Sequence, residues 1–330
     1  MADQVRLASI GLGWWGNVLA DAAVAAGAEV AACYARNLEA RHEFARKHGC
    51  VAAPSFEAVL ADPAIDGILL ATPHSTHADL IVAAAAAGKH VFVEKPLALT
   101  VVESKRAIAA MDEAGLVLQV GHNKRRHPAM RRLKEMVTGG ELGQVISMET
   151  NQSVANALGF APGYWRADRA ESPLGGMTSL GVHMIDNMHY LLGPIGRVFA
   201  FTNVLMDQPP IDDVTAVVVE FESGTLGYLG TSFVVPRTTS VALRGTDAAA
   251  FSTEDGARFF VQARGDDAPT EEPVEQLDTV ADELAEFARC IGGGGIPETG
   301  GPEALEVIAV MEAMMAASES GTAQAVGDFR

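Results

Sequence analysis

The chain has 330 residues, enough for two domains of ordinary size, and 48% of them are apolar. Its formal net charge of −18 provides no basic face for a phosphate backbone, so we expect no nucleic-acid partner. No apolar stretch reaches the roughly 20 residues that cross a bilayer, and no basic segment followed by an apolar run predicts a signal peptide. The three cysteines are scattered and form no CxxC pair, which predicts reduced thiols and a cytoplasmic protein without a membrane partner.

The first third of the chain alternates between short apolar runs and alanine-rich stretches, which predicts βαβ units around a parallel sheet. Thr100 and Glu103 form a capping-box pattern, and Gly88 and Gly115 stand where helices should end. The predicted strands are 5–10, 29–34, 67–71, 90–93 and 116–120, and the predicted helices are 17–26, 38–48, 78–87 and 101–114.

The pattern changes after Gly121. Strands and turns over 197–264, with a hairpin turn at 222–224, predict a mostly antiparallel sheet. We expect an α/β protein with a doubly wound Rossmann domain at 1–122 and a second α/β domain at 123–330. The other predicted features are a helix over 128–137, a strand from 145, a loop over 152–176, a helix over 178–192, an acidic loop over 265–275, a flexible joint at 292–295 and a closing helix over 303–317.

A GxGxxG motif follows the first predicted strand and precedes the first predicted helix. Gly11 permits the tight turn, Gly13 lets a pyrophosphate approach the backbone, and Gly16 allows close packing of helix on strand. The phosphates would sit at the helix N-terminus. In this context the motif predicts dinucleotide binding. Trp14 and Trp15 inside the loop either shield the pyrophosphate or simply pack.

The end of the second predicted strand bears on the choice of nucleotide. An acidic residue there would accept hydrogen bonds from the adenosine ribose, whereas an arginine favours a 2′-phosphate. This chain has Arg36 at that place and no acid before Glu39. The pattern therefore favours NADP, with NAD as the alternative, and with a solvated arginine as the explanation that needs no ligand.

Glu94 and Lys95 come directly after a buried strand, at the sheet edge where ligands of open α/β sheets bind. A lysine beside a nicotinamide can take or return the proton of an alcohol while hydride moves from carbon. A surface lysine that merely ends a strand is the alternative. We predict Lys95 as the principal acid/base and Glu94 as the neighbour that tunes it.

These motifs together resemble the Gfo/Idh/MocA oxidoreductase family, which includes glucose–fructose oxidoreductase and inositol dehydrogenase. The similarity rests on the glycine loop and on segments 71–77, 94–96, 121–126, 164–166 and 175–186, and it extends over nearly the whole chain. The combination of Glu-Lys-Pro with a later Gly-x-His is specific to this family.

The resemblance implies reversible oxidation of a secondary alcohol of a sugar or cyclitol, with Lys95 as acid/base. Thr72, Pro73 and His77 match an element that lies along the cofactor, and Asn123 belongs to a loop that faces the nicotinamide. The Lys-Pro bond, at Pro96 here, is often cis in the family. The resemblance also implies an open-faced sheet in the second domain that builds homodimers or homotetramers.

One position departs from the family pattern. Members often carry an aspartate four residues before the helix histidine, and this chain has Ser179 before His183. The two share a helix face and can both meet a substrate, but serine carries no charge to bias the histidine pKa. Asp186, one turn further on, is a candidate to orient the imidazole of His183. We predict His183 as the second proton-handling group, and Ser179 and Asp186 as substrate contacts.

Other polar and aromatic residues carry weaker predictions. Trp165 and Arg166 are candidate substrate contacts, and Arg125, Arg126 and Arg166 would suit an acidic substrate. His183, Asp186 and His189 spread over a third of the helix circumference, which disfavours a metal site, and none is predicted.

The main hypothesis is an NAD(P)-dependent oxidoreductase acting on the secondary alcohol or ketone of a sugar, cyclitol or related cyclic small molecule. Two alternatives stay open. Oxidation of a cyclic dihydrodiol would use the same machinery, and a dinucleotide-binding sensor of low activity would keep the fold, for which Ser179 is the argument.

Overall fold

The computed structural model describes residues 4–161, 163–206 and 210–330, and the chain divides into two compact units. Unit 1 comprises the residues up to Asn123 together with Asp278–Leu305, and unit 2 comprises Lys124–Leu277 and Glu306–Arg330. The chain thus leaves unit 1 close to the expected boundary at 122. Segment 278–305, expected in the second domain, belongs instead to unit 1.

Unit 1 contains a six-stranded parallel sheet in the order β3-β2-β1-β4-β5-β6. The chain builds outward from β1 in one direction and then returns to build in the other, so the order reverses between β1 and β4, where such sheets bind ligands. All five predicted strands are present, and the short β3 was not predicted. The strands are β1 (Arg6–Ile10), β2 (Glu29–Tyr34), β3 (Val51–Ala52), β4 (Gly67–Leu70), β5 (His90–Val93) and β6 (Leu118–Val120).

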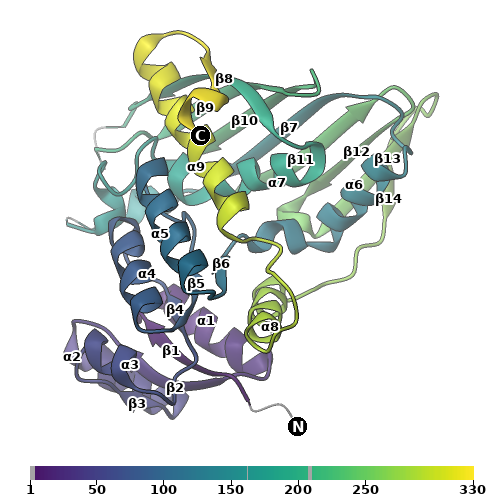
Figure 1. Cartoon of the computed structure of the whole chain (residues 1–330). Helices are drawn as coiled ribbons and strands as arrows, with labels where there is room; N and C mark the ends of the chain where they lie inside the picture. Colours follow the sequence, from purple (N-terminus) through teal and green to yellow (C-terminus); the bar gives the residue numbers. More distant parts are fainter. Residues whose placement is uncertain (1–3, 162, 207–209) are drawn as a thin grey trace. The chain divides into compact units, whose positions relative to one another are not determined.

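Helices cover both faces of this sheet, as a doubly wound fold requires. One core packs α3, α4 and α5 against the sheet, and the other packs α1, α2 and α8. Figure 1 shows α4 beside α5 and α1 beside α8. The predicted capping box is confirmed, since Thr100 Oγ1 accepts from the Glu103 amide and donates to its carboxylate. The helices are α1 (Trp14–Ala25), α2 (Leu38–His48), α3 (Phe56–Ala61), α4 (His77–Ala86), α5 (Val101–Glu113) and α8 (Thr279–Ile291).

Helix α8 was not predicted, although its sequence carries ordinary helix signals. The Asp278 carboxylate caps its first turn by accepting from the amides of Val280 and Ala281. Val280, Leu284 and Phe287 form an apolar stripe that is buried against unit 1, and the Phe287 ring lies 5.9 Å from that of Phe92. Burial of such a side chain stabilises the fold by about 1.5–3 kcal/mol. Helix α8 is therefore an integral part of the Rossmann unit.

Unit 2 is built on a nine-stranded sheet in the order β14-β13-β12-β11-β7-β10-β9-β8-β15. Every pair in the described part of this sheet is antiparallel except β7 with β10, which confirms the mostly antiparallel sheet. The strands are β7 (Val145–Ser153), β8 (Ile195–Asn203), β9 (Val214–Phe221), β10 (Leu226–Ser232), β11 (Thr238–Gly245), β12 (Ala248–Thr253), β13 (Arg258–Ala263), β14 (Thr270–Glu272) and β15 (Gln324–Ala325).

Two details of this sheet test the sequence predictions. The predicted hairpin turn between β9 and β10 is confirmed, since the Phe221 amide donates to the Thr225 carbonyl and Gly224 has a φ of +86°. The predicted acidic loop over 265–275 is wrong in part, because β14 lies within it and pairs with β13. Backbone hydrogen bonds to β13 stabilise β14, and the side-chain composition of the segment does not indicate this pairing.

Helices α6 (Pro128–Thr138) and α7 (Val182–Leu192) cover one face of the unit 2 sheet. On the other face Phe201, Val218 and Tyr228 are exposed by 69%, 54% and 44%. The sheet is therefore open on one side. Helix α9 (Gly301–Ser320) is longer than the predicted 303–317 and begins in unit 1. In the described part of the chain, no helix combines the length and the apolar character needed to span a membrane.

Candidate active site

The glycine loop of unit 1 has the local geometry that its sequence predicts. Gly11 has a φ of +91°, and a Cβ there would overlap the carbonyl oxygen of Ala71. A Cβ on Gly16 would overlap the carbonyl oxygen of Gly11, so this glycine lets α1 pack against the turn. In contrast, no atom of the described chain lies within 4 Å of the position a Cβ on Gly13 would take.

That open space lies at the N-terminus of α1, where Gly13 is the N-cap and no side chain caps the helix. Free amide groups and the positive end of the helix dipole favour an anion at such a place. The residues present therefore fit the pyrophosphate of a dinucleotide. Trp14 is 77% exposed beside this space, whereas Trp15 packs against the apolar core beneath α1. The two rings lie 5.2 Å apart. Trp15 is packed, and the shielding of a pyrophosphate by Trp14 stays a prediction.

Two arginines near the end of β2 have different surroundings. Arg41 lies over the Tyr34 ring at 4.8 Å, and its guanidinium donates to the carbonyl oxygens of Ala35, Ala53 and Pro54. Arg36 is exposed, and the structure gives its guanidinium no hydrogen bond or ion pair with a described residue. Arg41 thus holds the β2–β3 edge, and Arg36 is available to a ligand.

Thr72, Pro73 and His77 lie after β4, next to the glycine loop. The Thr76 hydroxyl donates to Thr72 Oγ1 at 2.8 Å and to the Pro73 carbonyl at 2.7 Å, which fixes this turn. His77 is fully buried, and its Nδ1 and Nε2 lie 2.9 Å from the Pro96 carbonyl and 3.1 Å from the Thr72 carbonyl. His77 therefore ties the turn after β4 to the segment after β5.

That second segment carries Glu94 and Lys95. The Lys95–Pro96 peptide bond is cis, as expected. Glu94 is buried and its amide donates to the Leu70 carbonyl, while Lys95 is partly buried. The Glu94 carboxylate lies so close to Gly121 that a Cβ there would come within 2.8 Å of Oε1. The Glu94 carboxylate thus lies against the glycine that directly follows β6.

Asn123, which follows β6, is buried and its side-chain amide donates to Thr279 Oγ1 at 2.8 Å. Thr299 also pins this strand end, because its hydroxyl donates to the Val120 carbonyl at 2.7 Å. The structure therefore brings the glycine loop, Thr72, Glu94, Lys95 and Asn123 to one edge of the unit 1 sheet. The contribution of the segment after 278 to this edge was missed by the sequence reasoning.

In unit 2, Ser179 and His183 lie on a helix that begins differently from the prediction. Residues Met177–Gly181 form one turn of π-helix (η5), and α7 follows from Val182. The Leu174–Gly175 turn before it has positive φ at both residues, 57° and 55°, a conformation that costs energy at leucine. The Thr178 hydroxyl donates to the Pro173 carbonyl across this turn.

A π-helical turn is wider than an α-helical one, so the turn Met177–Gly181 changes the direction in which its side chains point. Such turns are frequent at functional sites. Within this turn, a Cβ on Gly181 would overlap the Met177 sulfur, so a larger residue there would force the Met177 side chain to move. Ser179 and His183 are both buried, and they lie on the same helical segment as predicted.

Asp186 is fully buried and accepts a two-pronged pair of hydrogen bonds from Arg125, at 2.8 and 2.5 Å. Arg125 is therefore committed to a carboxylate of its own chain, and its charge is not spare for an acidic substrate. Its guanidinium lies 5.2 Å from the Tyr190 ring centre, and Lys134 approaches the same ring. Burial, together with the Arg125 charge, lowers the pKa of Lys134.

Trp165 and Arg166 lie in a short 3₁₀ turn, η4 (Trp165–Ala167), within the loop between β7 and the π-helix. The Arg166 guanidinium lies 4.3 Å from the Trp165 ring centre and donates to the Tyr164 hydroxyl at 2.8 Å. Arg166 thus orients two aromatic rings. Tyr164 is part of a motif in the sequence, and Phe160 is not, although the loop is rich in aromatic residues.

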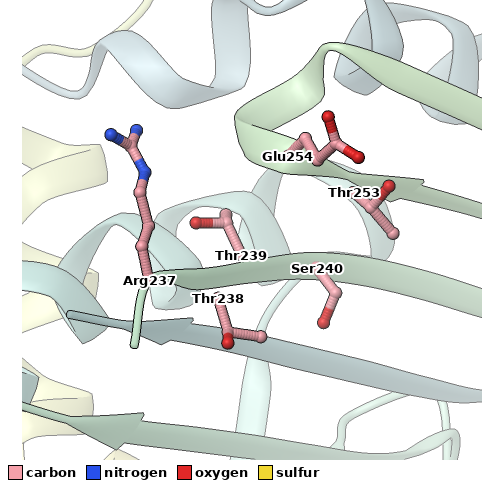
Figure 2. Close-up of a pocket in the computed structure, with 6 residues that line it drawn as sticks. All are labelled: Arg237, Thr238, Thr239, Ser240, Thr253 and Glu254. Carbon is pink, nitrogen blue, oxygen red and sulfur yellow. The ribbon is translucent and has the colours of Figure 1, made fainter. Parts of the chain in front are cut away.

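A hollow of about 350 Å³, lined by polar residues, opens at the start of β11 (Figure 2). Figure 2 shows Arg237 and Thr239 on one side of β11 and Thr238 and Ser240 on the other, as strand alternation requires. The hollow is closed by Thr253 and Glu254 of β12 and the turn that follows. Hydroxyl-bearing side chains with one acid and one base could hold a polyhydroxylated molecule.

The turn after β12, η6 (Glu254–Gly256), has positive φ at all three residues. Asp255 accepts from Lys124 at 2.8 Å and also from Arg237. Burial alone would raise the pKa of the Asp255 carboxyl, but the charge and hydrogen bond of Lys124, joined by Arg237, bring that pKa below its usual range. Beneath the turn, burial and the Lys124 charge lower the pKa of His127 to about 4.

No group of three or more His, Cys, Asp or Glu side chains in the described ranges is arranged to hold a metal ion.

Comparison with known proteins gives the family. Residues 5–122 match the profile described as oxidoreductase family, NAD-binding Rossmann fold, and residues 130–251 match the GFO/IDH/MocA C-terminal domain. The chain is 30% identical over 274 residues to a D-xylose 1-dehydrogenase (NADP⁺) of Haloferax volcanii, covering 82% of this chain and 83% of that protein. It is 34% identical over 246 residues to a scyllo-inositol 2-dehydrogenase (NAD⁺) of Bacillus subtilis, covering 72% and 69%.

A crystal structure of a candidate NADPH-dependent oxidoreductase from Desulfitobacterium hafniense has a TM-score of 0.94, with 30% identity over 100% of this chain and 99% of that one. The two profiles together match well over half of the chain, one within each unit. The chain belongs to the Gfo/Idh/MocA family and is an NAD(P)-dependent oxidoreductase.

Proposed function

We propose that this protein is a sugar or cyclitol dehydrogenase in which Lys95 exchanges a proton with the reacting hydroxyl. The observation that carries this proposal is the placement of Lys95 at the sheet edge that also holds the glycine loop. The names of the relatives support the substrate class, since one acts on an aldose and another on an inositol.

Each group at this edge has a task in the proposal. The bound nicotinamide would accept or return hydride at the carbinol carbon. The glycine loop and the start of α1 would bind the pyrophosphate, and Thr72 and Pro73 would border the cofactor. Lys95 takes the hydroxyl proton during oxidation and returns it during reduction. The buried Glu94 side chain is next to this lysine in sequence, and His77 holds the backbone on which Lys95 stands.

In unit 2, His183 is the proposed second proton-handling or substrate-orienting group, and Ser179 is the proposed hydroxyl partner of the substrate. Serine can donate and accept a hydrogen bond but holds no charge. The Asp186 carboxylate is paired with Arg125, so its role in the proposal is to fix the helix that carries His183.

We propose NADP as the preferred cofactor and NAD as the lesser one. Arg36 carries this proposal because it is exposed at the end of β2 and can pair with a 2′-phosphate in two-pronged fashion. Asn37 beside it is occupied in capping α2, where it accepts from the Ala40 amide.

The experiment is substitution of Lys95 by alanine, with turnover measured on a panel of aldoses and inositols by nicotinamide absorbance. Loss of the acid/base should lower kcat/KM by about 10²–10⁴-fold, while the Kd for NADPH changes less than about twofold because Lys95 is not its main anchor. The matched control is Lys105→Ala, which removes an exposed lysine of α5. Retention of turnover in Lys95→Ala would refute the assignment of the acid/base.

We further propose that the protein forms homodimers or homotetramers through the open face of the unit 2 sheet. Phe199, Val218 and Tyr228 are cross-strand neighbours on that face and form a contiguous apolar row. Cys33, Cys50 and Cys290 form no disulfide among the described residues, which supports the proposed cytoplasmic location.

A further inference from the structure

A second concavity of unit 2 lies at the loop between β7 and the π-helix and includes Trp165, one of the predicted substrate contacts. Its volume is about 730 Å³, within the range of small-molecule sites, which is about 300–1,000 Å³. It is lined by three aromatic rings, those of Phe160, Tyr164 and Trp165, and by the acidic residues Asp168 and Glu171.

The rings form one connected group. The Phe160 and Tyr164 ring centres lie 5.0 Å apart, and those of Tyr164 and Trp165 lie 6.1 Å apart. Arg166 holds the last two rings through its contact with Trp165 and its hydrogen bond to the Tyr164 hydroxyl. Phe160 is anchored from below by the Phe233 ring at 5.9 Å. Fixed flat apolar surfaces bind a ring-shaped ligand with little loss of side-chain entropy.

Two carboxylates beside these apolar rings add hydrogen-bond acceptors to the pocket. Asp168 is exposed at the rim, and only one of its oxygens is needed for the turn, where Oδ1 accepts from the Ala170 amide. Ionised carboxylates accept hydrogen bonds and donate none, so they suit a ligand rich in hydroxyl groups. An apolar ring face with hydroxyls at its rim is the chemistry of a pyranose or cyclitol ring.

The pocket is coupled to the helix that carries Ser179 and His183. Phe160 packs in a small apolar cluster with Ala157, Ile211 and Phe233, and Leu180 of the π-helix packs against the same cluster. Leu180 is the residue next to Ser179 in the chain. A ring bound on Phe160, Tyr164 and Trp165 therefore sits on the same packed unit as the substrate contacts of unit 2.

We propose that this aromatic pocket binds a second, non-reacting ring of the substrate, so that the preferred substrates are disaccharides or glycosides rather than single sugars. The inference rests on the proposed function for the identity of the reacting ring. The second ring stacks on Trp165 and Tyr164, and its hydroxyls donate to Asp168 and Glu171.

The test is calorimetric titration of the full-length protein with xylobiose against D-xylose, and with cellobiose against D-glucose, without oxidised cofactor so that no sugar is consumed. In the wild type at least one disaccharide should bind tenfold or more tightly than its monosaccharide. Trp165→Ala should bring the disaccharide Kd to the monosaccharide value, and Trp165→Phe should restore most of the difference. Asp168→Asn should weaken disaccharide binding threefold or more and leave monosaccharide binding unchanged.

The control is Ile296→Ala, which truncates an exposed apolar side chain of unit 1 and should change neither Kd. A monosaccharide Kd equal to that of the wild type shows that Trp165→Ala is folded, and Asp168→Asn tests the site without removing a ring. Equal binding of disaccharides and monosaccharides by the wild type, or disaccharide binding unaffected by Trp165→Ala, would overturn the inference. Titration reads binding without turnover, so a protein that binds these sugars and oxidises none would refute the proposed function alone.

Discussion

Two arginines near the end of β2 show how far the role of a residue can be predicted from its position in the sequence. Arg36 is identified by its place directly after the strand, and the structure leaves its side chain exposed. Arg41 looks like one more surface charge of an amphipathic helix, yet it is buried and satisfies carbonyl groups at Ala35, Ala53 and Pro54. Its role depends on β3, a two-residue strand that no periodic pattern reveals.

We expect Arg36→Asp to shift cofactor preference from NADP to NAD. The carboxylate would repel a 2′-phosphate and accept hydrogen bonds from a ribose 2′-hydroxyl. The Kd for NADPH should rise more than tenfold while the Kd for NADH falls or stays unchanged, measured by fluorescence titration. Arg46→Asp is the matched control, because it makes the same charge change at an exposed position of α2. If both variants change the two Kd values alike, the effect is one of net charge and not of recognition.

At the scale of elements, the turn from β1 into α1 contains two glycines with different surroundings. Gly16 has no room for a side chain, whereas Gly13 faces open space. We expect Gly16→Ala to lower the free energy of unfolding by about 1–3 kcal/mol, as overpacking does. Gly13→Ala should leave that free energy within about 0.5 kcal/mol and raise the Kd for NADPH, because the methyl group occupies the place of the pyrophosphate. Urea unfolding and cofactor titration of both variants check this, and equal behaviour of the two would contradict it.

The turn after β12 makes a second prediction, one that concerns pH. His127 lies beneath it, with Nε2 lacking a hydrogen-bond partner among the described residues, and its pKa falls from 6.5 to about 4. Because His127 is harder to protonate in the folded state, the unfolded chain binds more protons at pH values between about 4 and 6.5. Stability is therefore lost as the pH falls from about 6.5 toward 4, by about 2 kcal/mol at pH 5 for this group.

Urea unfolding at pH 7.5 and pH 5 should show this loss in the wild type, and His127→Gln should show a smaller one. For each protein the free energy of unfolding at pH 5 is subtracted from that at pH 7.5. Any loss of stability that the substitution causes at both pH values therefore cancels. An identical pH dependence in the two proteins would mean that His127 is not the group responsible.

Elements with local signals were predictable, and their tertiary partners were not. The strands and helices of the first 120 residues follow from apolar runs, caps and glycines. The helix over 178–192 was predicted, but its first turn is π-helical and follows a turn of positive φ at Leu174–Gly175 that the sequence pattern did not indicate. Helix α8 carries an N-cap and an apolar stripe that could have been recognised, but neither feature indicates which sheet the stripe covers.

At the scale of the whole molecule, the open face of the unit 2 sheet exposes apolar side chains on three neighbouring strands, among them Phe201, Val218 and Tyr228. Ion pairs between Arg197 and Glu220, at 3.2 Å, and between Arg244 and Glu149, at 3.1 Å, lie on strands of the same sheet as the apolar row. A surface with paired charges and an apolar centre can face a copy of itself across a two-fold axis.

We expect Val218→Glu combined with Phe201→Glu to convert the proposed oligomer to a monomer, because two acidic groups would have to be buried in the interface. Sedimentation-velocity measurement at micromolar concentration gives the mass. Val102→Glu, at an exposed position of α5 in unit 1, is the control and should keep the wild-type mass. A wild-type protein that sediments as a monomer would refute the proposed assembly.

Unit 1 is made of two segments that are far apart in the sequence, which limits how the protein can be truncated. Residues 124–277 are inserted into unit 1, whose last helix is supplied only after the insertion has been made. A truncated protein ending at Asn123 would keep every strand of the parallel sheet but would leave Leu7, Leu69 and Phe92 without the cover that α8 provides. During synthesis the same holds for the nascent chain, so the nucleotide-binding unit completes its core only when most of the protein has left the ribosome.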